Sequence, residues 1–276
     1  MTETNKQLHE TLIEILDFVK EICEKHELTY FLVFGTALGA KRHCGFIPWD
    51  DDVDIALPRE HYNIFIDALS ETDQSIFSLQ NEDNEPNYFL PFAKLRKNNT
   101  IFIEKILDVE YENNGIYIDI FPLDFVENPD SFNFKIRRTT FNYIKHILKF
   151  SSCRSFYKNK YSNVRYLIEN IMSIPTLFFS NRRLLFLANS LISSTTKADF
   201  IGQYDQKSNK RAIMPSNYYF PPRSAVFEGK TYSVPAKLED YLKCFYGSDY
   251  MELPPIEKRV THQPITLRFE KKFAIL

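Results

Sequence analysis

The sequence predicts an α+β fold with an α/β-type core, in which a mixed sheet with flanking helices carries a helical insertion. Apolar residues recur at helical spacing near the start, short apolar runs bounded by turn residues follow as far as residue 121, and basic helical sequence fills residues 131–200. With 276 residues and 44% hydrophobic content, the chain can bury one substantial core. We expect a mixed-sheet core at 1–130, a basic helical insertion at 131–200, and a segment at 201–276 that completes the functional site.

The first elements lead to a turn that can hold phosphate. An amphipathic helix is expected to end near His26, with an apolar face formed by Leu8, Leu12, Ile15, Leu16, Val19 and Ile22. The apolar run Tyr30 to Phe34 predicts a buried strand, which Gly35 and Thr36 connect to a short helix at 37–42. Because the first N–H groups of a helix lack partners within it, Gly35 and Thr36 are candidate phosphate-binding residues.

An acidic block precedes and enters the next expected strand, Val53 to Leu57. Side chains two apart on a strand project from the same face, so Asp52 and Asp54 are expected to converge on one divalent ion or a close pair of ions. Mg²⁺ prefers oxygen ligands from carboxylates and substrate phosphates. The pattern therefore predicts a metal site and a phosphorylated substrate.

The same acidic block also matches the beginning of a calcium loop. Asp50, Asp52 and Asp54 stand at the first, third and fifth positions of an EF-hand. Such a loop needs Gly at its sixth position and Glu at its twelfth, where this chain has Ile55 and His61. We therefore reject an EF-hand, and an acidic surface turn remains the alternative to the metal site.

The rest of the core is expected to contain one helix and three short strands. Pro58 suits the first turn of a helix at 59–69. The strands are expected at 75–79, 92–96 and 116–121.

The last of these strands contains a single charge. Asp119 shares one strand face with Tyr117 and Phe121, so its carboxylate is either buried or at the rim of a site. We predict that Asp119 is a third metal ligand. Pairing of Asp119 with an arginine, or capping of a following turn, remains the alternative.

Two pairs of basic residues are candidates for phosphate binding. Lys94 and Arg96 lie two apart on an expected strand and can point toward the same bound phosphates, although positive charge guarding an edge strand is an equal alternative. Arg42 and His43 follow the phosphate turn, and Arg42 is the better candidate.

The expected insertion carries most of the charge asymmetry of a chain whose net charge is only −2. From 131 to 196 the only acid is Glu169, against Lys135, Arg137, Arg138, Lys145, Lys149, Arg154, Lys158, Lys160, Arg165, Arg182 and Arg183. A membrane-spanning helix is not expected, because Pro175 and the polar residues 181–183 interrupt the apolar sequence. We predict that residues 131–200 contact the inner membrane surface or an anionic, lipid-linked glycan, with a solvated positive face as the alternative. Nucleic acid is not an expected partner because no recognition motif accompanies the charge.

The carboxy-terminal sequence predicts a helix at 236–246 that Gly247 ends, followed by the stiff pair Pro254 and Pro255. His262 is a candidate base or phosphate contact, and a packed, hydrogen-bonded histidine is the alternative.

Cysteine spacing and the polar amino-terminal sequence predict a cytoplasmic protein. The four cysteines are scattered and form no Cys-x-x-Cys pair, so neither a zinc site nor a disulfide framework is expected. No apolar signal segment stands at the start.

The motifs together resemble the LicD family of phosphotransferases, which also includes fukutin-related protein. The resemblance is carried by Gly35 to Ala40, Arg42-His43, Gly45 to Trp49 and Asp50 to Asp54, and later in order by Phe227 to Lys230, Val234 to Ala236, Asp240 to Leu242, Tyr246-Gly247, Leu253 to Pro255 and His262. One small departure is Ala37, where many relatives have leucine.

The resemblance implies a nucleotidyltransferase-like catalytic core whose Gly-Thr turn, here Gly35 and Thr36, holds phosphates. It also implies that Asp52, Asp54 and Asp119 bind Mg²⁺, with Mn²⁺ as a substitute, and that the region around His262 closes the substrate site. Such enzymes transfer the phosphorylated part of a CDP-activated small alcohol to a sugar hydroxyl of a cell-surface glycan such as teichoic acid, capsule or lipopolysaccharide. Phosphocholine is the first choice of transferred group. Ribitol phosphate or glycerol phosphate transfer, nucleotidyl transfer with release of diphosphate, and a non-catalytic binding role remain alternatives.

Overall fold

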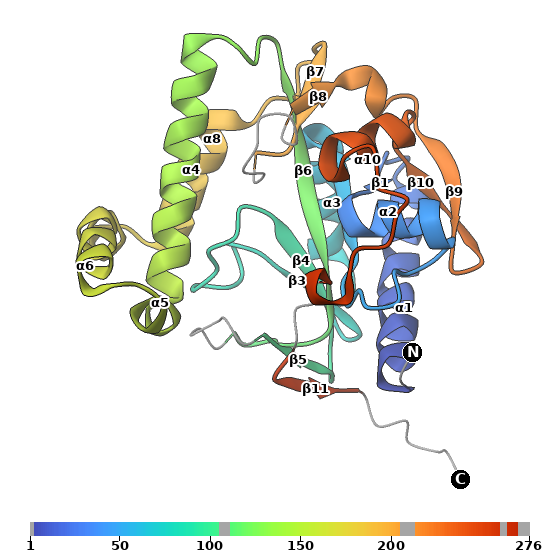
Figure 1. Ribbon diagram of the computed structural model, residues 1–276, viewed down its shortest axis with the longest axis horizontal. Helices are drawn as coiled ribbons and strands as arrows, with labels where there is room; N and C mark the ends of the chain where they lie inside the picture. The colour runs from blue at the N-terminus through green and yellow to red at the C-terminus, as the bar shows by residue number, and fades with distance from the viewer. Residues whose placement is uncertain (1–2, 105–110, 205–212, 260–263, 270–276) are drawn as a thin grey trace.

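The computed structural model describes residues 3–104, 111–204, 213–259 and 264–269 (Figure 1). Its centre is a seven-stranded mixed sheet in which β1, β2, β6, β4 and β3 are neighbours in that order, and β7 and β8 continue from β6. The strands are β1 (Phe31–Leu32), β2 (Asp54–Pro58), β3 (Phe77–Gln80), β4 (Ala93–Lys97), β6 (Tyr117–Val126), β7 (Phe200–Gly202) and β8 (Ile213–Pro215). The predicted α+β class is confirmed.

Strand pairing brings three charged positions together. Strands β2 and β6 are parallel, with Asp54 opposite Asp119, and β4 is antiparallel to β6, with Lys94 opposite Asp119. The two carboxylates therefore lie side by side near the beginning of adjacent strands, and the lysine comes from the next strand.

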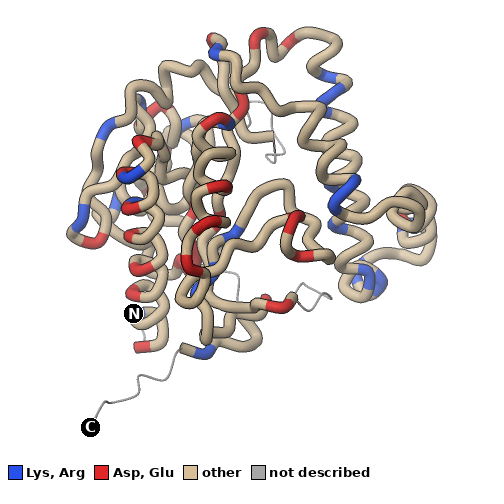
Figure 2. Tube along the Cα trace, turned by 180° about the vertical axis from the view of Figure 1, so that it is seen from behind, with Lys and Arg blue, Asp and Glu red and all other residues tan. Residues whose placement is uncertain are grey.

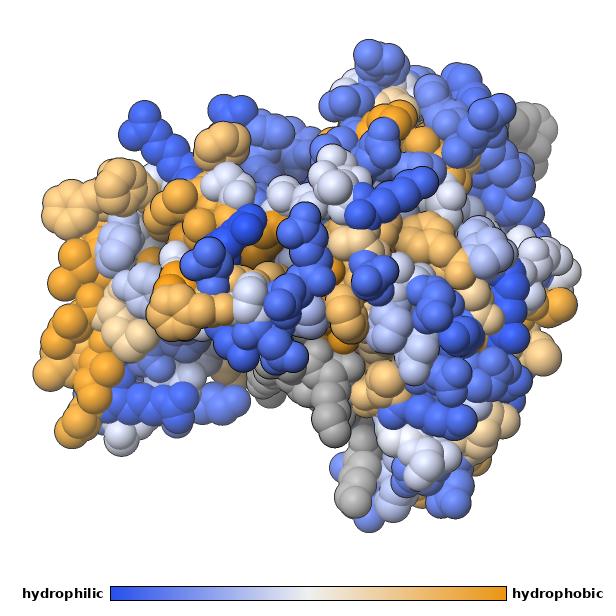
Figure 3. Space-filling view, turned by 90° about the horizontal axis from the view of Figure 1, so that it is seen from above, coloured by the Kyte–Doolittle hydropathy of each residue, from blue (hydrophilic) through white to orange (hydrophobic). Residues whose placement is uncertain are grey.

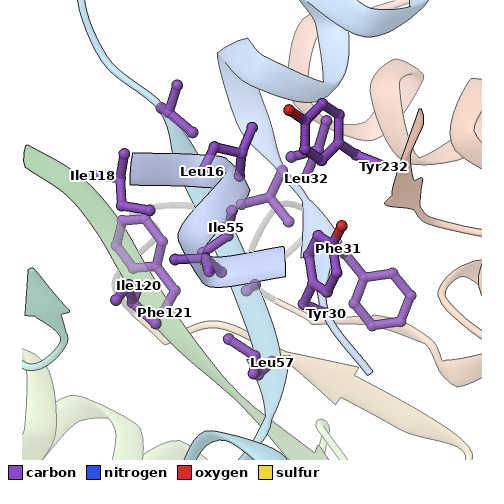
Figure 4. Packing of buried hydrophobic residues seen from close by; sticks show 14 of the residues in the cluster. Leu16, Tyr30, Phe31, Leu32, Ile55, Leu57, Ile118, Ile120, Phe121 and Tyr232 are labelled. Carbon is purple, nitrogen blue, oxygen red and sulfur yellow. The ribbon is translucent and has the colours of Figure 1, made fainter. Parts of the chain in front are cut away.

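Helices α1 (Glu3–Lys25) and α3 (Arg59–Glu71) pack against this sheet and against each other. Helix α2 (Phe34–His43) lies between β2 and helix α10 (Leu238–Tyr246), and the hairpin of β9 (Arg223–Phe227) and β10 (Lys230–Val234) packs beside β1 and α2. Figure 4 shows the resulting core, where Leu16 of α1 approaches Ile55 and Tyr232 of β10 lies beside Leu32. Near the carboxyl end are the helical turns η1 (Ser216–Tyr218) and η2 (Ile256–Lys258), and β11 (Thr266–Arg268) pairs with β5 (Ile101–Ile103).

A helical lobe stands beside the sheet, between β6 and β7 (Figure 1). It consists of α4 (Phe132–Ser152), α5 (Arg154–Lys160), α6 (Asn163–Met172), α7 (Pro175–Phe178) and α8 (Asn181–Ile192). Serine side chains cap α4, α6 and α8, and α4 and α8 bury a second apolar cluster between them. The lobe lies where the basic insertion was expected, while the exact domain boundaries stay a prediction. Within the described ranges, no helix is long and apolar enough to cross a membrane.

Several expected boundaries were wrong by a few residues. Strand β1 ends early because Phe34, at φ 46°, already begins α2. Strand β2 begins at Asp54, so Asp52 precedes the strand instead of sharing its face, and Pro58 ends β2 instead of starting the helix. Strand β6 continues through Pro122, which is tolerated because the pairing with β4 stops at Ile120 and that with β7 starts only at Asp124.

Candidate active site

Asp54 is the most enclosed carboxylate of the site, with 8% of the residue exposed. Its backbone is held on both sides: Asp54 N–H donates to Thr36 Oγ1 at 2.9 Å, and Val33 N–H donates to Asp54 O at 3.1 Å. The Thr36 hydroxyl thus joins the start of α2 to the start of β2. This contact gives Thr36 a structural task, while the phosphate role predicted for Gly35 and Thr36 stays a prediction.

Asp119 and Lys94 form a largely enclosed ion pair. Lys94 Nζ lies 2.7 Å from Asp119 Oδ1, and the two side chains are only 5% and 13% exposed. The ammonium also stands 3.4 Å from the ring centre of Tyr117, a geometry in which the aromatic face stabilises the cation. Lys94 is therefore fixed against the carboxylate that the sequence identifies as a metal ligand.

The electrostatic environment of Asp54 favours an additional cation. Burial raises the pKa of Asp54 well above its usual range, the carboxylates of Asp52, Asp119 and Asp50 raise it further, and Lys94 only partly opposes them. One lysine thus faces several carboxylates in a poorly solvated place. Oxygen ligands of this kind suit Mg²⁺ or Mn²⁺, so the side chains present fit such an ion.

The acidic turn before β2 adds a residue that the spacing argument missed. Asp50, Asp51 and Asp52 are half-buried and can offer oxygens that lie within 4.8 Å of one another. His9 Nε2–H donates to Asp50 O at 2.8 Å, which fixes this turn to α1. The metal-site prediction named Asp52 and Asp54 and left out Asp50, although Asp50 belongs to the same acidic block and continues the spacing of two.

Gly35 allows this turn to approach α2. A Cβ atom at Gly35 would lie 2.8 Å from Asp50 Oδ2, so a larger residue would displace that carboxylate. The N-cap residue Val33 gives α2 no side-chain hydrogen bond, and the N–H of Phe34, the first residue of the helix, donates to Tyr241 Oη at 3.0 Å. The glycine therefore brings the helix start and the carboxylates into contact.

The carboxy-terminal segment packs onto the same region. Arg42 Nη1 donates to the carbonyls of Tyr250 and Glu252, both at 2.9 Å, and the Arg259 guanidinium lies 4.1 Å from the ring centre of Trp49. These contacts place residues 250–259 over α2 and the loop before the acidic turn. That the carboxy-terminal segment completes the functional site stays a prediction.

The remaining predicted residues have different surroundings. Arg96 lies on the same face as Lys94, as the spacing predicts, but it is 2% exposed and donates to Gln80 Oε1 and Gly115 O. Its position favours a structural contribution, and phosphate contacts by Arg96 and Arg42 stay predictions. His262 lies outside the described residues.

The site lies on a mixed sheet whose adjacent parallel strands carry carboxylates, beside a helix start that contains glycine. This arrangement is typical of a nucleotidyltransferase-type domain. Residues 27–162 match the family model described as LicD/FKTN/FKRP, nucleotidyltransferase domain. This match confirms the resemblance to the LicD family seen in the sequence.

The similarity to one relative extends over nearly the whole chain. The lipopolysaccharide cholinephosphotransferase LicD of Haemophilus influenzae is 29% identical over 254 residues, which cover 91% of this chain and 92% of that protein. Shorter matches join this chain to uncharacterized proteins of Rickettsia typhi, 40% identical over 64 residues, and Rickettsia prowazekii, 40% identical over 50 residues. These cover 23% and 18% of this chain, and 21% and 19% of the two rickettsial proteins.

Proposed function

We propose that this protein is a Mg²⁺-dependent phosphotransferase that moves phosphocholine from CDP-choline to a sugar hydroxyl of a cell-surface glycan. The observation that carries the proposal is the pair Asp54 and Asp119, held side by side on parallel strands in surroundings that favour a further cation. The near full-length similarity to a lipopolysaccharide cholinephosphotransferase supports the choice of transferred group. Ribitol phosphate and glycerol phosphate, from their CDP-activated donors, are the other groups that the same site would transfer.

In this proposal, Asp52, Asp54 and Asp119 would hold the ion, and Asp50 lies beside Asp52. When bound, the ion would supply positive charge toward the donor diphosphate and the departing CMP. Lys94 keeps the Asp119 carboxylate oriented and supplies a positive charge that does not depend on the ion.

The reaction itself is a single displacement at phosphorus. The oxygen of the acceptor hydroxyl forms a bond to the phosphorus that carries choline, the bond from that phosphorus to the oxygen of CMP breaks, and CMP leaves. The hydroxyl proton passes to a base, for which a site carboxylate and His262 are the candidates. The start of α2 orients the donor phosphates, and residues 250–259 limit access of water.

The proposal places the enzyme in the cytoplasm, at the inner face of a membrane where a lipid-linked glycan would be available. Teichoic acid, capsular polysaccharide and lipopolysaccharide are the acceptor classes that this location allows. Nucleic acid is not among the proposed partners.

Product analysis tests the reaction class. CDP-choline, CDP-ribitol, CDP-glycerol and, as a nucleoside triphosphate, CTP are each incubated with a surface-glycan acceptor, with and without Mg²⁺, and both CMP and diphosphate release are measured. We expect Mg²⁺-dependent CMP release, fastest from CDP-choline, that Asp119→Asn abolishes and the exposed control Asp67→Asn retains. Diphosphate release from a nucleoside triphosphate would instead establish nucleotidyl transfer, and absence of any Mg²⁺-dependent nucleotide binding would favour a non-catalytic role.

A further inference from the structure

Helix α6 has its apolar face in solvent. Val164, Leu167, Ile168 and Ile171 follow the spacing of one helix face, and each is between 51% and 70% exposed. Surface helices of soluble domains normally turn such a face toward the core. The apolar side of α6 is therefore available to a partner.

The opposite, polar face of α6 attaches it to the rest of the lobe. Glu169 is 7% exposed and accepts a hydrogen bond from His146 Nε2 at 2.6 Å, and Arg154 of α5 donates to Asn170 Oδ1 at 3.0 Å. Tyr143 of α4 donates to the carbonyl of Met172 at 2.7 Å. Polar contacts thus hold the helix in an orientation that keeps its apolar side chains outward.

The apolar face continues onto the next two helices. Leu177, Phe178 and Phe179 follow α6, and Phe186 and Leu187 lie on α8, with exposures between 49% and 75%. An apolar groove of about 480 Å³ runs between α4, α7 and α8 beside them. Figure 3 shows hydrophobic residues gathered at the left edge of the molecule, over this lobe. The exposed apolar residues of α6, of segment 177–179 and of α8 are together named the apolar surface. They are Val164, Leu167, Ile168, Ile171, Leu177, Phe178, Phe179, Phe186 and Leu187.

The segment that carries the apolar surface is rich in positive charge. Between residues 154 and 187 the cations are Arg154, Lys158, Lys160, Arg165, Arg182 and Arg183, and the single acid is Glu169, which is buried. Lysines and arginines accordingly outnumber acids on the lobe in Figure 2, whereas acids are frequent on α1 and α3. Two copies meeting symmetrically through this face would bring their cations together, which disfavours self-association.

We propose that the apolar surface docks the protein onto an anionic lipid leaflet. Phe178, Leu177 and their neighbours enter the boundary between headgroups and acyl chains, while the surrounding lysines and arginines contact the anionic headgroups. An apolar centre with aromatic residues and a cationic rim matches such a leaflet in both chemistry and charge. The inference concerns attachment and holds whichever alcohol the enzyme transfers.

Vesicle co-sedimentation tests the proposal with three proteins of the full chain. The double variant Leu177→Ser/Phe178→Ser removes two of the three most exposed side chains of the apolar surface, and Phe132→Ser is the matched control. Phe132 begins α4 at 76% exposure, against 75% for Phe178, and is not part of the apolar surface. The vesicles contain phosphatidylcholine alone or phosphatidylcholine mixed with phosphatidylglycerol.

We expect the unmodified protein to bind the anionic vesicles in preference to the neutral ones, and less tightly as salt is raised. The double variant should lose at least about tenfold in affinity, because two large apolar groups no longer leave water, while Phe132→Ser should stay within about twofold. Equal binding to both vesicle types, or full binding by the double variant, would overturn the proposal. Sedimentation equilibrium measures the mass of the protein in solution. If that mass halves in the double variant and vesicle binding does not change, the apolar surface would be assigned to contact with a second copy instead.

CMP release with a water-soluble acceptor separates this proposal from the proposed reaction. The double variant should keep the unmodified rate, because none of the substituted residues touches the carboxylate site. Vesicle binding without CMP release from any donor would contradict the reaction class and leave the docking surface standing.

Discussion

The sheet core and the helical lobe both enclose carboxylates, but they differ in where they place apolar side chains. In the core, Asp54, Asp119 and Lys94 are enclosed together at the start of β2 and β6. In the lobe, Glu169 is enclosed while the apolar face of α6 is exposed. Each region thus departs from the usual rule that apolar groups are buried and charges solvated.

The two departures point to two kinds of partner. We propose that the enclosed carboxylates, which outnumber nearby cations, would be stabilised by a metal ion, and that the exposed apolar residues would be stabilised by an anionic lipid leaflet. Departures from local consistency are expected where function requires them. The contrast therefore separates a chemical site from an attachment site within one chain.

The largest effect is expected from removing the enclosed carboxylate of the core. Asp54→Asn should lower CMP release by about a thousandfold or more, since the ion loses a ligand beside the reacting phosphate. The fold should survive, because a neutral amide relieves repulsion from Asp52 and Asp119. Activity assays check the first statement, and thermal unfolding in EDTA or in Mg²⁺ checks the second. Mg²⁺ should raise the unfolding temperature of the unmodified protein and of the control Asp67→Asn, but not that of Asp54→Asn. A variant with full activity would remove Asp54 from the metal site.

Two enclosed ion pairs distinguish the metal site from ordinary structure. Lys94 pairs with Asp119 at the site, and Arg59 pairs with Asp124 by two hydrogen bonds of 2.8 Å farther along the same strand. Lys94→Met and Arg59→Met should each lower the free energy of unfolding by about 3–5 kcal/mol, because each leaves an enclosed carboxylate without its cation.

Mg²⁺ should distinguish these two variants. It should restore part of the stability of Lys94→Met, since the ion supplies the charge that Asp119 has lost, and add nothing to Arg59→Met beyond its effect on the unmodified protein. Urea unfolding of all three proteins, in EDTA and in Mg²⁺, provides the comparison. Equal recovery of both variants would mean that the ion does not act at Asp119.

The pH dependence of stability offers a smaller and independent effect. Burial and neighbouring carboxylates raise the pKa of Asp54 in the folded chain above its usual value of 3.8. At pH values between the usual pKa and the raised pKa, the folded chain therefore binds more protons than the unfolded chain. In EDTA, stability should therefore fall as pH rises through this range, by up to about 1.4 kcal/mol for each pH unit. Urea unfolding from about pH 5 to about pH 8 measures the slope. Asp54→Asn should flatten it, and an unchanged slope would assign the effect to another group.

The order and type of the main elements were predictable because the core obeys local rules. Apolar spacing predicted α1, and the apolar runs predicted β2, β4 and β6 within a few residues. The three-residue strands β5 and β7 leave too short a pattern to be recognised. Their pairing depends on contacts between distant segments, as when β11 pairs with β5.

The site was predictable in its carboxylates and less so in its contacts. Asp54 and Asp119 lie opposite each other as a metal site requires, but no sequence rule indicates that Lys94 stands against Asp119 or that Arg42 reaches the carbonyls of residues 250 and 252. The exposed face of α6 was also hidden, because an amphipathic pattern shows that two faces differ and does not say which one meets the core.

The smallest effects come from two glutamates that each face two basic side chains. Glu169 of the lobe is 9% exposed in its side chain, beside His146 and Arg165, whereas Glu239 of the core is 37% exposed, beside Lys41 and Arg223. Glu169→Gln should lower the free energy of unfolding by about 1–2 kcal/mol, because an enclosed hydrogen bond loses its charge. Glu239→Gln should cost less than about 1 kcal/mol, since solvent and salt screen an exposed pair.

The response to pH and salt gives these two variants different signatures. Partial burial opposes ionisation of Glu239, but hydrogen bonds from Lys41 and Arg223 lower its pKa to about 2 from the usual 4.5. The small stabilisation that ionised Glu239 contributes is thus present above pH 4.5 and lost as pH falls toward 2. In urea unfolding, Glu239→Gln should therefore be as stable as the unmodified protein near pH 2 or in high salt. The loss in Glu169→Gln should persist in high salt because the Glu169 side chain itself is enclosed, at 9% exposure. A larger loss of unfolding free energy from Glu239→Gln than from Glu169→Gln would mean that polar contacts do not hold α6. The apolar contacts of α4 and α8 would then have to explain why the apolar face of α6 points outward.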